Sequence, residues 1–278
     1  MIVDFRARPM MKGLENFFRK EMTIGANMRF GATPAPSYLE FFQNPEKSIT
    51  MFIEEMKQAG VDKAVITGRN ITFCQVPNDN LAALVRQYPD QLIGFAGIDP
   101  SNMIHQAIPE LERCIKELKL SGVNMDPGLS ALRMYPSDRR IYPIYAKIVE
   151  LGVPLIMMTG PMAGPDITYT DPAHISQIAS DFPRMNIICG HGCWPYVTQA
   201  IGLMFRHRNV YISPDVYLWM PGRDLYVDAA NKMPDQFLYA TAYPFRPLDS
   251  IKEYKEFAFT KDALEKSLYT NAAKLLKL

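Results

Sequence analysis

Residues Asn186–Tyr196 read NIICGHGCWPY, and this stretch decides how the rest of the chain is interpreted. Ile187–Cys189 is a short apolar run typical of a buried strand, and Gly190 ends it. His191 follows directly, between two glycines. Pro195 is well placed to open a helix, because apolar residues then recur at helical spacing. The stretch predicts a strand–turn–helix unit with a histidine at the carboxyl end of its strand.

The same unit recurs along the chain, because a helix-like pattern such as Tyr142–Leu151 follows nearly every strand-like run. The eight strand-like runs are Ile2–Phe5, Lys63–Thr67, Leu92–Ala96, Gly122–Met125, Pro154–Met158, Ile187–Cys189, Asn209–Ser213 and Phe237–Thr241. Strands that alternate with helices form a parallel sheet, and eight such strands close it. We therefore predict the α/β class, with a single TIM (β/α)8 barrel domain over residues 1–278. The long stretch between the first strand and Asn44 is interpreted as a functional flap.

Composition and charge narrow the class of protein. The 278 residues are 48% hydrophobic and carry a net charge of +1, which gives no indication of a nucleic-acid or membrane surface. No apolar run approaches the roughly 18 residues that a membrane span needs. Four cysteines without a secretory signal favour free thiols in a reducing compartment, so a cytoplasmic location is expected.

In such a barrel, the side chains just beyond the carboxyl ends of the strands form the site. The candidate substrate-binding residues are Arg6, Arg8, Arg69, Thr159, Asp166, Trp194 and Arg246. Guanidinium groups bind carboxylates or phosphates bidentately, so the arginines could converge on an anion. The alternative is that they form salt bridges with neighbouring aspartates at the barrel mouth. For Asp166, in the Gly- and Pro-rich loop Thr159–Thr170, the stronger interpretation is that it fixes a turn between Pro165 and Ile167.

The candidate catalytic residues are His191, Asp126 and Asp215, because all three are expected at strand ends. A carboxylate beside an imidazole can act as a general base or as a metal ligand. The other histidines, which fall on helix-like segments, are His105, His174 and His207. The Cys189/His191/Cys193 spacing is weak evidence for zinc, since structural zinc needs a fourth ligand and its cysteine pairs normally come from turns.

The chain resembles the amidohydrolase-related family, in its second amidohydrolase group, a TIM-barrel family of decarboxylases, lactonases and related hydrolases. The segments that carry the resemblance are Val3–Phe5 (VDF), Gly94–Pro100 (GFAGIDP), Gly152–Gly160 (GVPLIMMTG), Ile187–Gly192 (IICGHG), Asn209–Pro214 (NVYISP), Ala240–Phe245 (ATAYPF) and Glu265–Leu276 (EKSLYTNAAKLL). The resemblance covers the chain end to end, and the closing helix is its most specific part.

The residues at the family's metal centre are different here. The resemblance implies two histidines after the first strand, where this chain has Arg6 and Arg8. The fifth-strand histidine falls at Met158 and the eighth-strand aspartate at Ala242, so only His191 is retained. Arginine has no lone pair to donate to zinc. We expect no metal at the inherited position, and the alternative is one zinc or manganese ion at a rebuilt His191/Asp126/Asp215 site.

The sequence therefore predicts a hydrolase that cleaves a lactone- or amide-type bond of a small carboxylated compound. His191 would act as acid/base, and Arg6 and Arg8 would bind the anionic group. One alternative is a decarboxylase of an aromatic or muconate-like acid, assisted by a metal at the rebuilt site, and another is a non-catalytic binding protein. The expected partner is a small anionic substrate, with no nucleic acid and no membrane. The oligomeric state stays open, with Trp219–Pro221 as a candidate subunit contact.

Overall fold

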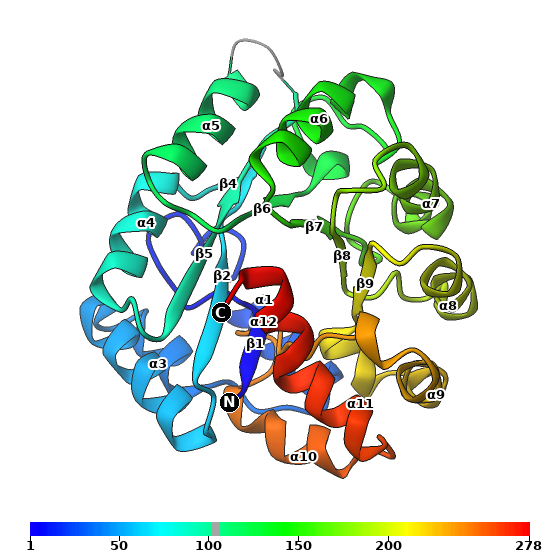
Figure 1. The fold of residues 1–278 in the computed structure, drawn as a ribbon. Coiled ribbons are helices and arrows are strands. Elements are labelled where there is room, and N and C mark those ends of the chain that lie inside the picture. The colour runs from blue at the N-terminus through cyan, green and yellow to red at the C-terminus, as the bar shows by residue number, and fades with distance from the viewer. Residues whose placement is uncertain (102–105) are drawn as a thin grey trace.

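The computed structural model describes residues 1–101 and 106–278, and a parallel sheet surrounded by helices forms its centre (Figure 1). Each neighbouring pair of strands in this sheet is parallel. In spatial order the strands are β1 (Val3–Ala7), β2 (Lys63–Thr67), β5 (Leu92–Gly97), β6 (Gly122–Met125), β7 (Leu155–Met158), β8 (Ile187–Gly190) and β9 (Val210–Ser213). Spatial order follows chain order, as in a barrel built from repeated strand–helix units.

The segment after β9 and its helix closes the sheet. Leu238 N donates a hydrogen bond to Ile212 O of β9 at 3.0 Å, and Phe5 N of β1 donates to Tyr239 O at 2.9 Å. Residues 237–243 thus lie between the first and last strands and bond to both. The predicted TIM barrel is confirmed.

Two local predictions are wrong. Phe237–Thr241 does not form a regular strand, and only isolated bridges mark it. The segment leaves the extended conformation just beyond this run, where Ala242 adopts a φ of +51°. The helix after β8 begins at Val197 and not at Pro195, because a turn that contains His191 occupies the intervening residues.

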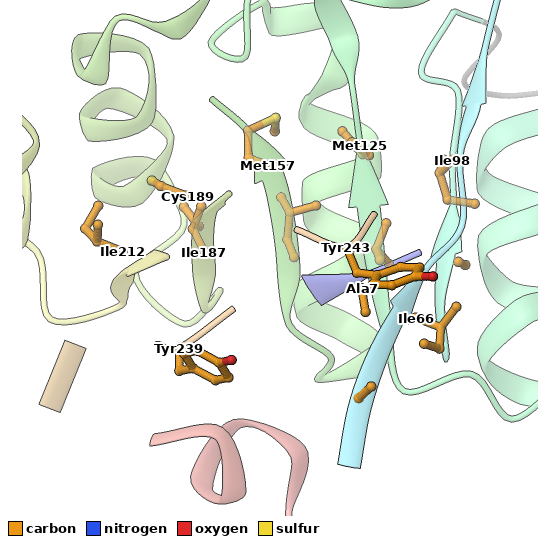
Figure 2. Close-up of a cluster of buried hydrophobic side chains, with 14 of the residues drawn as sticks. Ala7, Ile66, Ile98, Met125, Met157, Ile187, Cys189, Ile212, Tyr239 and Tyr243 are labelled. Carbon is orange, nitrogen blue, oxygen red and sulfur yellow. The ribbon is translucent and has the colours of Figure 1, made fainter. Parts of the chain in front are cut away.

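Helices cover the outside of the sheet (Figure 1). Those on the outside that follow the strands are α3 (Pro45–Ala59), α4 (Asn78–Gln87), α5 (Ile108–Lys116), α6 (Tyr142–Leu151), α7 (Pro172–Asp181), α8 (Val197–Arg206), α9 (Arg223–Lys232), α10 (Ile251–Glu256) and α11 (Lys261–Glu265), whereas α12 (Asn271–Leu276) lies across one end of the barrel. Outward-facing strand residues such as Ile66, Met125 and Met157 belong to the apolar cluster that these helices bury (Figure 2). None of the described helices is long and apolar enough to cross a membrane.

The inside of the barrel contains a second apolar cluster. Val3, Phe5 and Phe95 pack there with Ala272 and Leu275 of α12. Strand residues alternate between the two faces of a sheet, so the inward set fills the barrel while the outward set meets the helices. Because α12 closes this end of the interior, the chemistry of the chain is left to the carboxyl ends of the strands.

The stretch predicted as a flap contains two helices, α1 (Lys20–Arg29) and α2 (Pro36–Glu40), and packs against residues at the barrel mouth. Asn27 Nδ2 donates hydrogen bonds to Pro244 O at 2.8 Å and to Phe245 O at 2.7 Å. The ring of Phe30 meets the ring of Tyr217 edge to face, with centroids 5.7 Å apart. These contacts hold the stretch against the mouth of the barrel. A two-stranded hairpin, β3 (Asn70–Ile71) and β4 (Cys74–Gln75), follows β2.

Candidate active site

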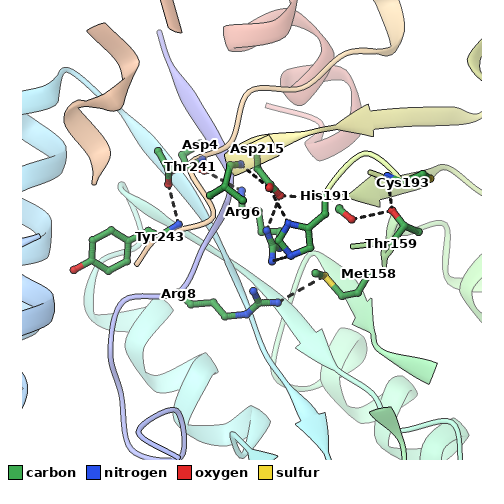
Figure 3. A network of polar contacts seen from close by, with 12 residues as sticks. Asp4, Arg6, Arg8, Met158, Thr159, His191, Cys193, Asp215, Thr241 and Tyr243 are labelled. Carbon is green, nitrogen blue, oxygen red and sulfur yellow. Dashed lines mark hydrogen bonds and ion pairs between the residues drawn. The ribbon is translucent and has the colours of Figure 1, made fainter. Parts of the chain in front are cut away.

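The first strand delivers two arginines to the mouth of the barrel. Its register against β2 shifts between Asp4 and Ala7, as in a β-bulge. A bulge adds a residue to one strand and turns the following side chains. Arg6 and Arg8, two residues apart, both reach the group of polar residues drawn in Figure 3. Each side chain is only 2% exposed.

Arg6, Asp215 and His191 form a closed triangle of hydrogen bonds (Figure 3). Arg6 Nη1 lies 2.6 Å from Asp215 Oδ2, and Arg6 Nη2 lies 2.8 Å from His191 Nε2. His191 Nδ1 lies 2.8 Å from Asp215 Oδ1. A guanidinium can only donate, so Nε2 accepts and the imidazole proton is assigned to Nδ1.

Local backbone geometry holds the triangle. His191 has a φ of +72° and Asp215 a φ of +45°, which is the left-handed region that residues with side chains rarely adopt. Such conformations occur mostly at functional sites, where the surrounding contacts enforce them. His191 N donates to Asp215 Oδ2 at 3.1 Å. Gly160 lies against the imidazole, since a Cβ there would be 2.6 Å from His191 Cδ2.

His191 is a neutral imidazole at neutral pH. Burial lowers its pKa to about 4, and the charge of Arg6 acts in the same direction while Asp215 opposes both. Both ring nitrogens already have partners, so the imidazole cannot take a proton from a ligand until Arg6 moves away from Nε2. In this arrangement His191 positions Arg6.

Arg69 and Asp126 form a second buried pair. Arg69 Nη2 lies 2.7 Å from Asp126 Oδ1, and its Nε lies 3.3 Å from Oδ2. The guanidinium lies over the ring of Phe17, 4.1 Å from the centroid. Burial tends to raise the pKa of the Asp126 carboxyl, but Arg69, Arg8 and Arg6 together hold it below its ordinary value. Asp126 is therefore a stable carboxylate, bound bidentately to an arginine.

Arg8 has no such partner. Among the described residues, no carboxylate lies within ion-pair distance of its guanidinium, and its one polar contact joins Nη2 to Met158 Sδ at 3.9 Å. Burial, with Arg69 and Arg6 nearby, lowers its pKa well below the ordinary value for arginine. Of these three guanidiniums, Arg6 and Arg69 are ion-paired with Asp215 and Asp126, and Arg8 is the one without a carboxylate partner among the described residues.

Several buried polar atoms at the strand ends lack a hydrogen-bond partner among the described residues. They are Arg6 Nε, Arg8 Nε, Arg69 Nη1, Thr67 Oγ1, Asn124 Oδ1 and Ser213 Oγ. Buried polar groups are normally hydrogen-bonded, so unpaired groups call for a specific explanation. Three of these six atoms are guanidinium nitrogens that belong to the arginines described above. A ligand with acceptor atoms would satisfy them.

Thr159 and Trp194, two further predicted substrate-binding residues, contact the residues around His191. Thr159 Oγ1 donates to Gly190 O at 2.8 Å and accepts from Cys193 N at 3.1 Å, so it fixes the turn around His191. The Trp194 ring stacks on Tyr217, with centroids 5.0 Å apart, and Tyr217 in turn meets His191 edge to face at 5.2 Å.

Asp166 and Arg246 make no hydrogen bond or ion pair with Arg6, Asp215 or His191. Asp166 is exposed and accepts from Thr168 N at 2.8 Å, which fixes the start of a short 3-10 helix. Each nitrogen group of Arg246 has a partner of its own: the carbonyl of Phe30, the hydroxyl of Ser250 and the carboxylate of Glu253. Asp166 thus fixes a local turn, and Arg246 ties the stretch that contains Phe30 to the segment after Ala242.

Sequence reasoning missed two residues that contact the site, Tyr217 and Phe17. Tyr217 lies two residues beyond Asp215, so its place after a strand was a usable signal. Phe17 comes from the stretch that covers the mouth, and nothing in its local sequence indicates contact with Arg69. Of the remaining histidines, His174 lies in α7 and His207 ends α8, while His105 lies outside the described residues.

The side chains of the described residues do not fit a metal ion. Within residues 1–101 and 106–278, no three His, Cys, Asp or Glu side chains are placed to hold one. His191 Nε2 faces Arg6, and Asp215 Oδ2 is bound to the same guanidinium. Asp126 is bound to Arg69, so the structure does not bring His191, Asp126 and Asp215 together as a ligand set.

Comparisons with known proteins agree with the fold. A family model described as amidohydrolase matches residues 31–278. An uncharacterized TIM-barrel protein from Bordetella bronchiseptica is 38% identical, with a TM-score of 0.92 over 99% of this chain and 98% of that one. The 5-carboxyvanillate decarboxylase of Novosphingobium aromaticivorans, solved with bound manganese, has a TM-score of 0.69 at 17% identity over 100% of this chain and 97% of that one.

Among curated proteins, the 2-keto-4-carboxy-3-hexenedioate hydratase of a Sphingobium species is 26% identical over 191 residues. The match covers 57% of this chain and 56% of the hydratase, so the chain spans little more than half the length of that relative. A hydratase and a decarboxylase, both named for carboxylated compounds, therefore stand among the proteins that this chain resembles.

Proposed function

The chain belongs to the amidohydrolase family, and from that premise we propose that it is an enzyme acting on a small carboxylated compound at the barrel mouth. The observation that carries the proposal is Arg8, a buried guanidinium without a carboxylate partner among the described residues. Burying an unpaired charge is unfavourable. A carboxylate of the substrate supplies the missing partner, and the planar guanidinium can bind it bidentately.

The neighbouring guanidiniums extend this anion site. Arg6 Nε and Arg69 Nη1 are buried without partners, so both have N–H groups left for oxygen atoms of the substrate. Preorganised donors of this kind stabilise negative charge that develops during a reaction. We assign carboxylate binding to Arg8, and stabilisation of the developing charge to Arg6 and Arg69.

The geometry favours decarboxylation. The addition of water to a carbon–carbon double bond, which also needs a base, is a second candidate because a hydratase stands among the relatives. Hydrolysis of a lactone or amide, the reaction expected from the sequence, needs a base that takes a proton from water. His191, Asp126 and Asp215 are all engaged with arginines. Loss of carbon dioxide instead places negative charge on the substrate, which a cationic site stabilises. The two named relatives are a decarboxylase and a hydratase.

The test is turnover of a panel of small unsaturated and aromatic carboxylic acids, their methyl esters and a set of lactones. Carbon dioxide release and the ultraviolet absorbance of the double bond report the two lyase reactions separately. We expect turnover of at least one acid and none of its ester. For variants of Arg8, Arg246→Lys is the matched control, because Arg246 is equally buried but has partners within the protein for all of its guanidinium nitrogens.

Equal turnover of an ester and its parent acid would contradict the assignment of Arg8. Turnover of lactones alone would restore the hydrolase interpretation. Binding of carboxylic acids without turnover of any panel member would favour the non-catalytic binding protein.

A further inference from the structure

Arg6 binds two atoms that could serve as ligands of a divalent cation. Asp215 Oδ2 is a carboxylate oxygen and His191 Nε2 is an imidazole lone pair, and both point at one guanidinium, at 2.6 and 2.8 Å. A zinc ion would have to approach each donor to about 2.0–2.2 Å. The guanidinium and the metal ion therefore compete for the same two atoms.

We propose that Arg6 is the resident cation of this site: its guanidinium occupies the position between Asp215 and His191 that a divalent metal ion would take, and the site works without such an ion. The inference rests on the contacts of Arg6 and stands apart from the reaction assigned above.

Arg6 is fixed in this position by its surroundings. Its backbone N donates to Asp4 Oδ1 at 3.0 Å, and its side chain is 2% exposed. Asp215 and His191 are themselves joined by a hydrogen bond, so this bond holds Asp215 Oδ2 and His191 Nε2 toward the guanidinium. A charge held by buried contacts does not exchange with solvent as a metal ion does.

Arg6 can also serve a ligand while it holds these donors. A guanidinium has five N–H groups, and two are used by Asp215 and His191. Three remain, among them the buried Nε–H without a partner. Arg6 thus has both properties of a central cation. Asp215 and His191 bind it, and three of its N–H groups stay available for a ligand.

Arg8 provides the contrast. It lies two residues away on the same strand end, yet it makes no hydrogen bond or ion pair with Asp215 or His191. Replacing Arg8 by histidine adds an imidazole but leaves Arg6 on the donor pair. Replacing Arg6 by histidine adds an imidazole and also frees both donors, giving the three protein ligands that tight zinc binding ordinarily requires.

The experiment measures zinc affinity of the wild type, Arg6→His and Arg8→His by competition with a chromogenic chelator, with circular dichroism to confirm folding. We expect Arg6→His to bind zinc at least ~100-fold more tightly than the wild type, because it completes a three-ligand set, and Arg8→His to show no gain. Equal affinities of Arg6→His and the wild type would overturn the proposal.

A second measurement on the wild type decides the question if Arg6→His does not fold. Protein purified without chelator is analysed for zinc and manganese, beside His191→Ala. Less than one-tenth of an equivalent in the wild type supports the proposal, whereas one equivalent that is lost in His191→Ala overturns it. Neither readout needs turnover, so both stay informative if the panel of acids yields no substrate.

Discussion

The inside of the barrel has two halves that share the same strands and differ in chemistry. At the end closed by α12, Phe5, Phe95 and Leu275 form a dry apolar cluster. At the mouth, one to three residues further along, Arg6 and Arg8 replace that cluster with buried charge. The first half gains stability from burial of apolar surface, and the second gives up stability to hold unpaired polar groups.

This difference separates the residues that hold the fold from those that act. A change in the apolar half should lower stability and leave the activity of the folded protein intact. Removal of the unpaired Arg8 charge from the charged half should lower activity without loss of stability. Variants in each half test that separation.

The largest effect is expected from Phe95→Ala. Phe95 is fully buried and meets Phe5 edge to face, with ring centroids 5.8 Å apart. Truncation of a buried aromatic side chain leaves a cavity, so the free energy of unfolding should fall by about 3–5 kcal/mol. Urea denaturation followed by circular dichroism measures this. A loss below about 1 kcal/mol would mean that the barrel interior is not packed as described.

The next effect concerns activity. Arg8→Met keeps a long side chain and removes the charge, so kcat/KM for a carboxylate substrate should fall about 10- to 1,000-fold, the range for loss of one charge-assisted contact. Steady-state kinetics with the substrate found in the panel provide the measurement. Arg246→Lys serves as control and should change kcat/KM far less. A similar loss in both variants would end the distinction between the two arginines.

A smaller effect links stability to pH. The folded pKa of His191, about 4, lies below its unfolded value, so stability falls as pH drops from 7 to 5. Burial raises the pKa of Asp4 to about 6, which has the opposite sign: protonation favours the folded state, and the lower pH restores part of the loss. Asp4→Asn removes this compensation.

Asp4→Asn should therefore lose about 1 kcal/mol more than the wild type between pH 7 and pH 5. Urea denaturation of both proteins at the two pH values gives this difference directly. An identical pH dependence would show that the Asp4 carboxyl titrates with an ordinary pKa.

The smallest effect is expected from Asp166→Ala, in the loop Thr159–Thr170. Asp166 is exposed and accepts hydrogen bonds from Thr168 alone, so Asp166→Ala should cost about 0.5–1 kcal/mol of stability, as for loss of a helix cap. Its kcat/KM should stay within about twofold of the wild type, because surface changes away from the site have small effects. A tenfold loss would place Asp166 in contact with the substrate after all.

The fold was predictable because strand-forming runs are local signals. Lys63–Thr67 and Gly122–Met125 form strands with the predicted bounds, since each is a short buried run followed by a change in composition. Phe237–Thr241 shows the same apolar pattern but does not form a regular strand. A hydrophobic pattern reports burial and cannot report where a backbone leaves the extended conformation.

The site was predictable only in part, because pairing is a property of the fold. Arg6 and Asp215 are 209 residues apart in the chain, and Arg69 and Asp126 are 57 apart. The sequence indicated that arginines and aspartates gather at strand ends. It could not indicate which arginine stays without a partner, since Arg8 and Arg246 are equally plausible from their positions.

The most direct test of the carboxylate site at Arg8 is the free energy of unfolding of the wild type and Arg8→Met, each with and without benzoate, with benzamide as the neutral control. At a concentration 100 times its Kd, benzoate should stabilise the wild type by about 2.7 kcal/mol and leave Arg8→Met unchanged. Without benzoate, the variant should be at least as stable as the wild type, because a buried unpaired charge has been removed. Equal stabilisation of both proteins by benzoate would contradict the account.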